Sequence, residues 1–142
     1  MGAEMSISSI RSALKQGLQT IDGMHVYEKV PEKIEQFPAC VISPKRGDYN
    51  QQFTNSFAIN FTVTLLIGRW GDIKEAQDKL DSYLMPTGSL SIKAAIEASA
   101  AADVVHVYAF EDYGGIQFAS GNQYATGSEV YLGCHFMVSI FV

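Results

Sequence analysis

Three histidines and two cysteines carry the strongest metal-binding and nucleophilic chemistry in this chain. His25, His106 and His135 fall on three different predicted strands, whereas a metal site needs several ligands that converge on one point. Cys134 and His135 are neighbours on a predicted strand, so their side chains point to opposite faces and cannot share an ion. We therefore expect structural or surface roles for the histidines and no metal site. Cys40 and Cys134 both lie in apolar, strand-like runs, which predicts buried core residues rather than a disulfide framework.

The common catalytic and phosphate-binding motifs are missing from the sequence. There is no Gly-x-Ser-x-Gly nucleophile motif, and neither of the glycine-rich nucleotide-binding motifs occurs. Asp78 and Asp81 are expected on the solvent side of a helix, and Glu111 and Asp112 at a strand end beside a Tyr-Gly-Gly turn. Two carboxylates can perform acid–base chemistry when their surroundings separate their pKa values, but neighbours at a turn are usually solvated. We expect no enzymatic activity, no catalytic residue and no cofactor.

Length and charge narrow the class of protein further. A chain of 142 residues is expected to form a single domain. The net charge of −5 and the scattered basic residues, of which only Lys45 and Arg46 are adjacent, argue against a nucleic-acid-binding surface. No signal peptide or membrane-spanning run is recognisable, so we expect a soluble protein kept in the cytoplasm. Only 18% of the residues are charged, which fits a protein that hides part of its surface in an assembly.

The clearest structural element is a long strand at residues 57–67. Its odd positions are all large and apolar, which predicts one buried face. These positions are Phe57, Ile59, Phe61, Val63, Leu65 and Ile67. Residues 130–142 alternate in the same way, so we expect the two strands to form the centre of a sheet. The even face of the first strand carries Asn60, Thr62 and Thr64. The sequence leaves two alternatives for this face, which are contact with solvent and the lining of an enclosed space.

Other elements are expected on both sides of this pair. Helical spacing predicts helices at 6–21, 72–84 and 91–101, the first with an apolar stripe of Ile7, Ile10, Leu14, Leu18 and Ile21. Shorter strands are predicted at 24–29 and 39–43, which should pair, and at 104–110. Pro44 is expected to close the second of these and to open a polar loop at 44–56. Gly114 and Gly115 predict a turn, followed by a short hairpin built from 116–118 and 123–125.

A family resemblance becomes visible in the second half of the chain. The runs Leu-Ser-Ile-Lys-Ala-Ala-Ile-Glu from Leu90, Val-Val-His-Val-Tyr-Ala-Phe-Glu-Asp-Tyr-Gly from Val104 and Tyr-Leu-Gly-Cys-His-Phe-Met-Val-Ser-Ile from Tyr131 carry it. Their layout is similar to that of the tail terminator, or tail completion, proteins of long-tailed bacteriophages. The opening helix, the long central strand and the helix start at Trp70-Gly71-Asp72 match as well, so the resemblance covers nearly the whole chain.

The resemblance implies an α+β domain with about three helices packed on a mainly antiparallel sheet. Such proteins are virion components that assemble in the host cytoplasm as a ring, typically a homo-hexamer. The ring sits at the neck end of the tail and stops polymerisation of the major tail tube protein. It also provides the head–tail joining surface for the head or neck connector protein. DNA only passes through the lumen of the ring. An acidic chain would not retain it, because DNA is a polyanion. No membrane is involved.

The same resemblance implies contact surfaces between subunits or with the tube. The candidate interface residues lie in or beside the segments 44–56 and 111–129 and at the exit of the long strand. They are Tyr49, Phe53, Arg69, Trp70, Tyr113, Phe118 and Tyr124. Aromatic side chains in polar, glycine-containing surroundings are typical interface anchors, although they can equally fold back onto their own domain. Two alternatives remain open: another tail or neck component, such as a tube or head–tail joining protein, and a small oligomeric enzyme or ligand-binding domain.

Overall fold

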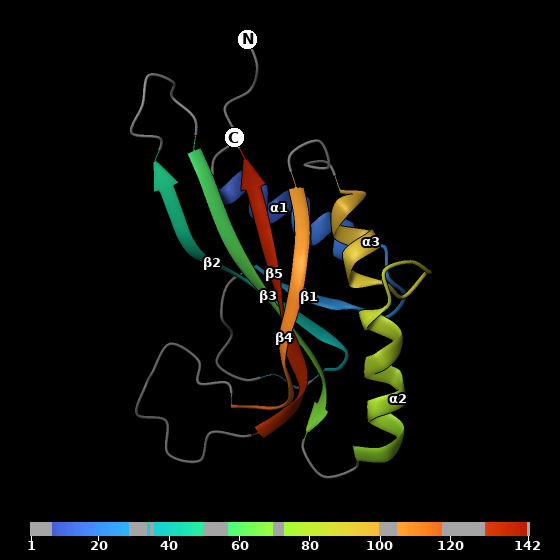
Figure 1. Ribbon diagram of the computed structural model, residues 1–142. Helices are drawn as coiled ribbons and strands as arrows, with labels where there is room; N and C mark the ends of the chain where they lie inside the picture. The colour runs from blue at the N-terminus through green and yellow to red at the C-terminus, as the bar shows by residue number, and fades with distance from the viewer. Residues whose placement is uncertain are drawn as a thin grey trace.

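The computed structural model describes residues 7–28, 34, 36–49, 57–69, 73–99, 105–117 and 130–141. Eight elements follow one another along the chain (Figure 1). They are α1 (Ile7–Leu18), β1 (His25–Tyr27), β2 (Ala39–Tyr49), β3 (Phe57–Arg69), α2 (Ile73–Leu84), α3 (Ile92–Glu97), β4 (Val105–Gln117) and β5 (Val130–Phe141).

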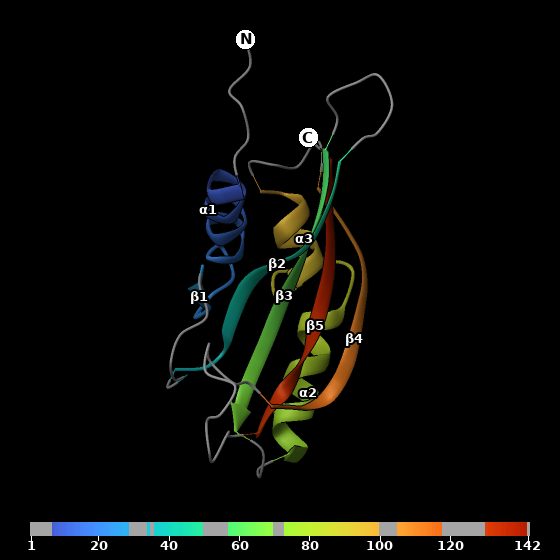
Figure 2. The same cartoon turned by 90° about the vertical axis from the view of Figure 1, so that its left-hand side faces the viewer.

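The five strands form one sheet in the order β1-β2-β3-β5-β4. All neighbouring pairs are antiparallel except β1 and β2, which run parallel. Figure 2 shows the long strands as one twisted layer with the helices beside it. The fold is therefore α+β: within the described residues, three helices accompany a mainly antiparallel sheet.

The central pair of strands is β3 and β5, as the alternating sequence predicts. Their ladder runs from Ala58 opposite Phe141 to Arg69 opposite Tyr131. The odd positions of β3 that the structure describes, from Ile59 to Ile67, are all buried in the core between the sheet and the helices. The even positions of β5 meet them there, so the predicted period of two correctly identifies the buried face of both strands.

The helices contribute apolar stripes to this core. In α1, Ile10, Leu14 and Leu18 are fully buried, whereas Ile7 is 40% exposed, so its predicted place in the buried stripe is wrong. In α2, Leu80 and also Tyr83 are buried. The helix α3 lies close against α1: a Cβ added to Gly17 would come within 2.8 Å of Ser99 Cβ. Glycine therefore permits the close helix contact that the small residues of α3 suggest.

Predicted loop residues 44–49 belong to β2, which continues to Tyr49 instead of ending at Pro44. Pro44 is opposite Phe61 in the ladder, and the register shifts between Pro44 and Arg46. A proline can stay in a strand that is free on one side, because the missing N–H then removes no ladder hydrogen bond. Residues 50–56 of the expected loop lie outside the described residues.

The expected turn at Gly114-Gly115 is also wrong, because β4 runs straight through it to Gln117. The register with β5 shifts between Val107 and Ala109 and again between Glu111 and Gly114. Asp112 has a φ of 61° and Gly114 one of 135°, so this stretch bulges rather than reverses. Glu111 and Asp112 consequently lie inside a strand and not at its end, and residues 116–117 extend β4 instead of opening a hairpin. Residues 118 and 123–125 lie outside the described residues.

A second, smaller apolar cluster covers one end of the sheet's other face. It comprises Ile34, Ala39, Val41, Leu66, Ile116 and Tyr131, with Phe37 packed against Tyr131 at a centroid distance of 5.8 Å. Toward the other end of this face, Asn60 and Thr62 are half-buried. The predicted even face of the long strand is thus partly apolar and covered and partly polar and open.

Candidate functional site

The three histidines lie on three different strands, as the sequence predicts. His25 lies on β1, His106 on β4 and His135 on β5. Cys134 is fully buried in the core, whereas His135 lies on the opposite sheet face and is half-buried. In the part of the chain that the structure describes, no three His, Cys, Asp or Glu side chains are arranged to hold a metal ion. In the same part of the chain, no helix is long and apolar enough to cross a membrane.

Both cysteines are free, buried thiols. Cys40 and Cys134 are opposite Leu65 from its two neighbouring strands, so they are two strand spacings apart, roughly 10 Å. A disulfide needs Cα atoms within about 7 Å, so these two residues cannot be bridged in this fold. Burial raises the pKa of the Cys40 thiol well above its usual range and that of Cys134 to about 12. The thiols are therefore protonated and unreactive in the folded protein.

A polar hollow of about 480 Å³ lies on the open face of the sheet. Side chains from β2, β3, β4 and β5 line it: Ser43, Pro44, Lys45, Thr62, Glu111, Asp112, His135 and Met137. Lys45 stands on the β2 side, and the carboxylates Glu111 and Asp112 stand on the β4 side. The hollow therefore presents opposite charges on its two walls and hydroxyl groups on its floor.

The ring of His135 is fixed at the edge of this hollow. Its Nδ1 lies 2.8 Å from Thr64 Oγ1, and its Nε2 lies 3.9 Å from Asp112 Oδ2. The bulged conformation of Asp112 directs its carboxylate toward the ring. The three groups follow the hydroxyl–imidazole–carboxylate order of a hydrolase, but Thr64 is only 5% exposed and lies behind the ring. The hydroxyl thus orients the imidazole, and the arrangement supplies a positioned polar contact rather than an accessible nucleophile.

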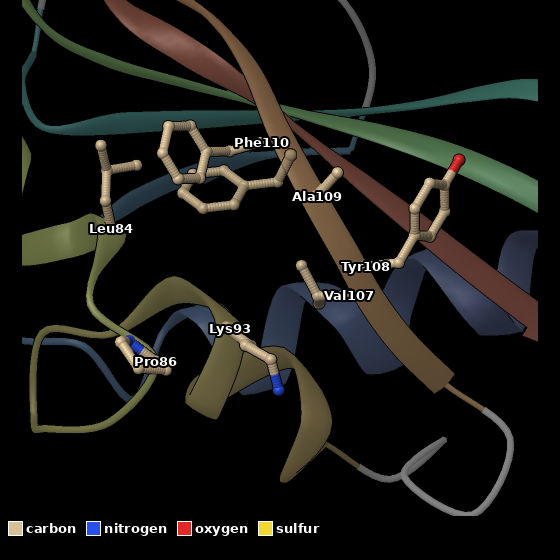
Figure 3. A pocket seen from close by; sticks show the side chains of 8 residues that line it. Leu84, Pro86, Lys93, Val107, Tyr108, Ala109 and Phe110 are labelled. Carbon is tan, nitrogen blue, oxygen red and sulfur yellow. The ribbon is translucent and has the colours of Figure 1, made fainter.

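A second hollow, of about 390 Å³, is mainly apolar and lies between β4 and the helices α2 and α3. Its lining comprises Leu84, Pro86, Lys93, Val107, Tyr108, Ala109, Phe110 and Phe136. Figure 3 shows Leu84 beside two phenyl rings, and Pro86 and Lys93 across from Val107. The rings of Phe110 and Phe136 are tilted against each other with centroids 6.3 Å apart, so Phe110 continues the core outward to the surface.

Exposed apolar side chains gather around this groove. Met85 is 57% exposed, Tyr108 52%, Phe110 48% and Tyr113 40%. We refer to these four residues as the β4 ridge. Among the described residues, Ile7 is the only other large hydrophobic side chain with comparable exposure. Large exposed apolar side chains on and beside one edge strand are typical of a surface that binds another molecule.

The ridge is tied to α2 through Tyr113. The Tyr113 hydroxyl donates a hydrogen bond of 2.7 Å to Asp81 Oδ1. This bond, together with the nearby negative charge of Asp81, raises the pKa of Tyr113 to about 12. The phenol therefore stays neutral and keeps its ring fixed beside the helix.

The outer backbone edge of β4 is partly blocked by α3. Glu97 accepts a hydrogen bond of 3.2 Å from the backbone N–H of Val107 and pairs with Lys93 at 2.7 Å. A second contact joins it to His106 at 3.3 Å. Burial alone would raise the pKa of Glu97, but the hydrogen bonds from Lys93 and Val107 outweigh it and lower that pKa. The carboxylate is thus ionised and occupies a place where another strand would pair.

Of the interface residues predicted from the sequence, only Tyr113 has a described side chain, and it belongs to the β4 ridge. Tyr49 is opposite Phe57 and Arg69 is opposite Tyr131, which places their backbones at opposite ends of β3. Their side chains are outside the described part, as are all atoms of Phe53, Trp70, Phe118 and Tyr124.

Three members of the ridge, Met85, Tyr108 and Phe110, escaped the sequence-based prediction. Tyr108 and Phe110 lie in the run Val-His-Val-Tyr-Ala-Phe from Val105. In this run the aromatic residues occupy even positions, after an alternation set by the two valines. Only the shift of register after Val107 shows that the alternation breaks and that these rings are exposed.

Comparison with models of known protein families gives no match for this chain. Comparison with curated protein sequences gives none either.

Proposed function

We propose that this chain is a structural subunit of a bacteriophage tail, namely a tail terminator that acts as a ring at the neck end of the tail tube. The proposal unites the layout of the sequence, which resembles that family, with the β4 ridge. The ridge is the observation that carries it, because a subunit of a ring must present an apolar surface to a neighbour.

The position of the ridge favours assembly over a role within the chain. Phe110 already packs on Phe136 from one side and is still 48% exposed on the other. Met85 follows the last residue of α2, so the ridge joins a helix end to an edge strand. A monomer in water gains nothing from leaving these apolar side chains uncovered, whereas a second protein surface would bury them favourably.

The proposed partners are further copies of the chain, the major tail tube protein and the head or neck connector protein. In this role the protein ends up in the virion after assembly in the host cytoplasm. DNA passes the ring without being held, which the net charge of −5 supports because it repels a polyanion. The number of subunits, typically six in the family that the sequence resembles, is part of the same proposal.

Two measurements test this function directly. Native mass spectrometry of the purified chain should give a closed oligomer, and negative-stain electron micrographs should show rings. Added to isolated tail tubes, the protein should cap one end and stop their elongation. A strict monomer that leaves tube growth unchanged would refute the proposal, and incorporation along the whole tube would instead identify a tube protein.

The polar hollow favours a second candidate function, a small oligomeric ligand-binding domain. His135 is held in place by Thr64, and Lys45 faces two carboxylates across the same space. Such convergent polar groups are common in sites for small polar molecules. A small molecule that stays bound in native mass spectra, and that is lost when His135 is replaced by Ala, would favour this candidate over the ring.

A further inference from the structure

We infer that the polar hollow on the open face of the sheet binds a small zwitterion, a molecule with an ammonium group and a carboxylate at opposite ends of a short chain. In this arrangement the ammonium group lies against Glu111 and Asp112, and the carboxylate lies against Lys45. The inference rests on the ligand-binding candidate of the proposed function, whose ligand class it specifies, and it does not require the ring.

The floor of the hollow is set by the register of four neighbouring strands. Ser43 on β2 and Met137 on β5 are both opposite Thr62 on β3. In the next row of the sheet, His135 on β5 is opposite Glu111 on β4. Directly opposed side chains of an antiparallel pair lie on the same sheet face, close to each other. The strands alone therefore bring these groups together.

The imidazole of His135 is positioned from behind. Its Nδ1 lies 2.8 Å from Oγ1 of Thr64, which is only 5% exposed, so the buried hydroxyl fixes the orientation of the ring. Its Nε2 lies 3.9 Å from Asp112 Oδ2, which is longer than a hydrogen bond. The Nε2 atom and the Asp112 carboxylate therefore remain as polar groups that a ligand can contact.

Two bulges place charged side chains around this floor. On β2 the register shifts between Pro44 and Arg46, so Lys45 is the extra residue of that bulge. On β4 a second shift of register contains Asp112, whose φ is 61°. Bulges redirect side chains and are over-represented beside functional sites. Here one bulge brings a cation and the other an anion to the same hollow.

The opposite charges of the hollow stand on separate walls. Within the described residues, no ion pair joins Lys45 to Glu111 or Asp112. The strands β2 and β4 flank β3 and β5, so their backbones are three strand spacings apart, roughly 14 Å. A simple anion would meet two carboxylates in the hollow, and a simple cation would meet the lysine. A molecule with both charges at opposite ends of a short chain complements both walls.

Three probes of similar length test the inference. The probe δ-aminovalerate carries both charges, whereas valerate carries only the carboxylate and pentylamine only the ammonium group. In NMR titrations of the full chain, δ-aminovalerate should shift the imidazole signals of His135 in a saturable manner. Valerate and pentylamine should bind about tenfold or more weakly, because each leaves one charged wall without a partner. No saturable shift at His135, or equal binding of the three probes, would overturn the inference.

Substitutions on the two walls separate their roles. Lys45→Met removes the positive charge and retains the length of the side chain, so it should abolish the preference for δ-aminovalerate over pentylamine. Glu111→Gln with Asp112→Asn should abolish the preference over valerate, and Asn tolerates the positive φ at this position. Lys79→Met, at an exposed position on α2, is the matched control and should leave binding unchanged. Folded wall variants that keep both preferences would contradict the inference.

The remaining controls separate this inference from the proposed function. Circular dichroism and thermal melts verify that each variant folds, and Lys45→Met alone decides if the double substitution unfolds the chain. If no probe binds while a different small molecule stays bound to the hollow in native mass spectra, the zwitterion is wrong and the ligand-binding candidate stands. If rings form and the hollow binds no small molecule, that candidate and this inference both fail, whereas the tail terminator proposal stands.

Discussion

Phe61 and Phe110 offer a matched pair of phenylalanines on the same sheet. Phe61 on β3 is fully buried between helices and sheet, whereas Phe110 on β4 is 48% exposed. Replacing a fully buried phenylalanine with alanine costs about 3 to 5 kcal/mol through lost transfer free energy and the cavity left behind. Phe110 buries only about half of its side chain and leaves no closed cavity, so Phe110→Ala should cost about 1 to 2 kcal/mol.

The two substitutions should affect self-association in the opposite order to their effects on stability. Phe110→Ala removes part of the β4 ridge, so it should weaken self-association, whereas Phe61→Ala should leave association of the folded fraction unchanged. Urea denaturation at concentrations below the association threshold measures the first effect, because oligomerisation would otherwise add to the apparent stability. Sedimentation velocity measures the second. Equal destabilisation by both substitutions would show that the ring of Phe110 belongs to the core and would refute the ridge as a contact surface.

Three further predictions follow from the core and from the ridge. Gly133→Ala should destabilise the fold by about 1 to 3 kcal/mol in urea titrations, since the new Cβ would collide with the backbone of β3. The thiols of Cys40 and Cys134 should react with a thiol reagent only in denaturant, and rapid labelling of native protein would contradict their burial. Tyr113 should ionise at about pH 12, so its contribution to stability should be lost as the pH rises from about 10 to 12. Asp81→Asn should move that ultraviolet titration toward lower pH.

Much of the fold was predictable because its central strands obey a period of two. The alternation around Phe61 and Phe136 identifies both strands, their buried faces and their pairing. Helical spacing also located the three helices, although α3 ends at Glu97 and not at residue 101. The structure adds that Ser91 caps α3 by accepting a hydrogen bond from Ala94 N–H. These features depend on residues close in sequence, which is why sequence patterns report them.

The lengths of β2 and β4 were not predictable in the same way. Pro44 and the pair Gly114-Gly115 end strands in most sequences, yet here they lie within strands as parts of bulges. Whether such residues turn or bulge depends on a partner strand that continues alongside. For β2 that partner is β3, and for β4 it is β5, so tertiary pairing outweighs the local preference.

The polar hollow could not be predicted from the sequence for the same reason. Thr64, Asp112 and His135 meet only because three strands from distant parts of the chain adopt one particular register. The position of Asp112 further depends on a bulge with positive φ, which no neighbouring residue signals. The sequence therefore suggested a solvated carboxylate pair at a turn, whereas the structure brings one carboxylate to a fixed imidazole.

The outer edge of β4 is poorly suited to pairing with another strand. An exposed edge of β4 could pair with any strand, and such pairing is neither selective nor limited in extent. Glu97 occupies one of its outward N–H groups, and two bulges distort the remainder, so the backbone offers poor hydrogen bonding to another chain. In the proposed ring, the side chains of the ridge would instead bind a neighbouring surface of matching shape. A proposed ring built on such contacts would close at a defined number of subunits, because each contact would fix an orientation that strand addition alone would leave open to indefinite growth.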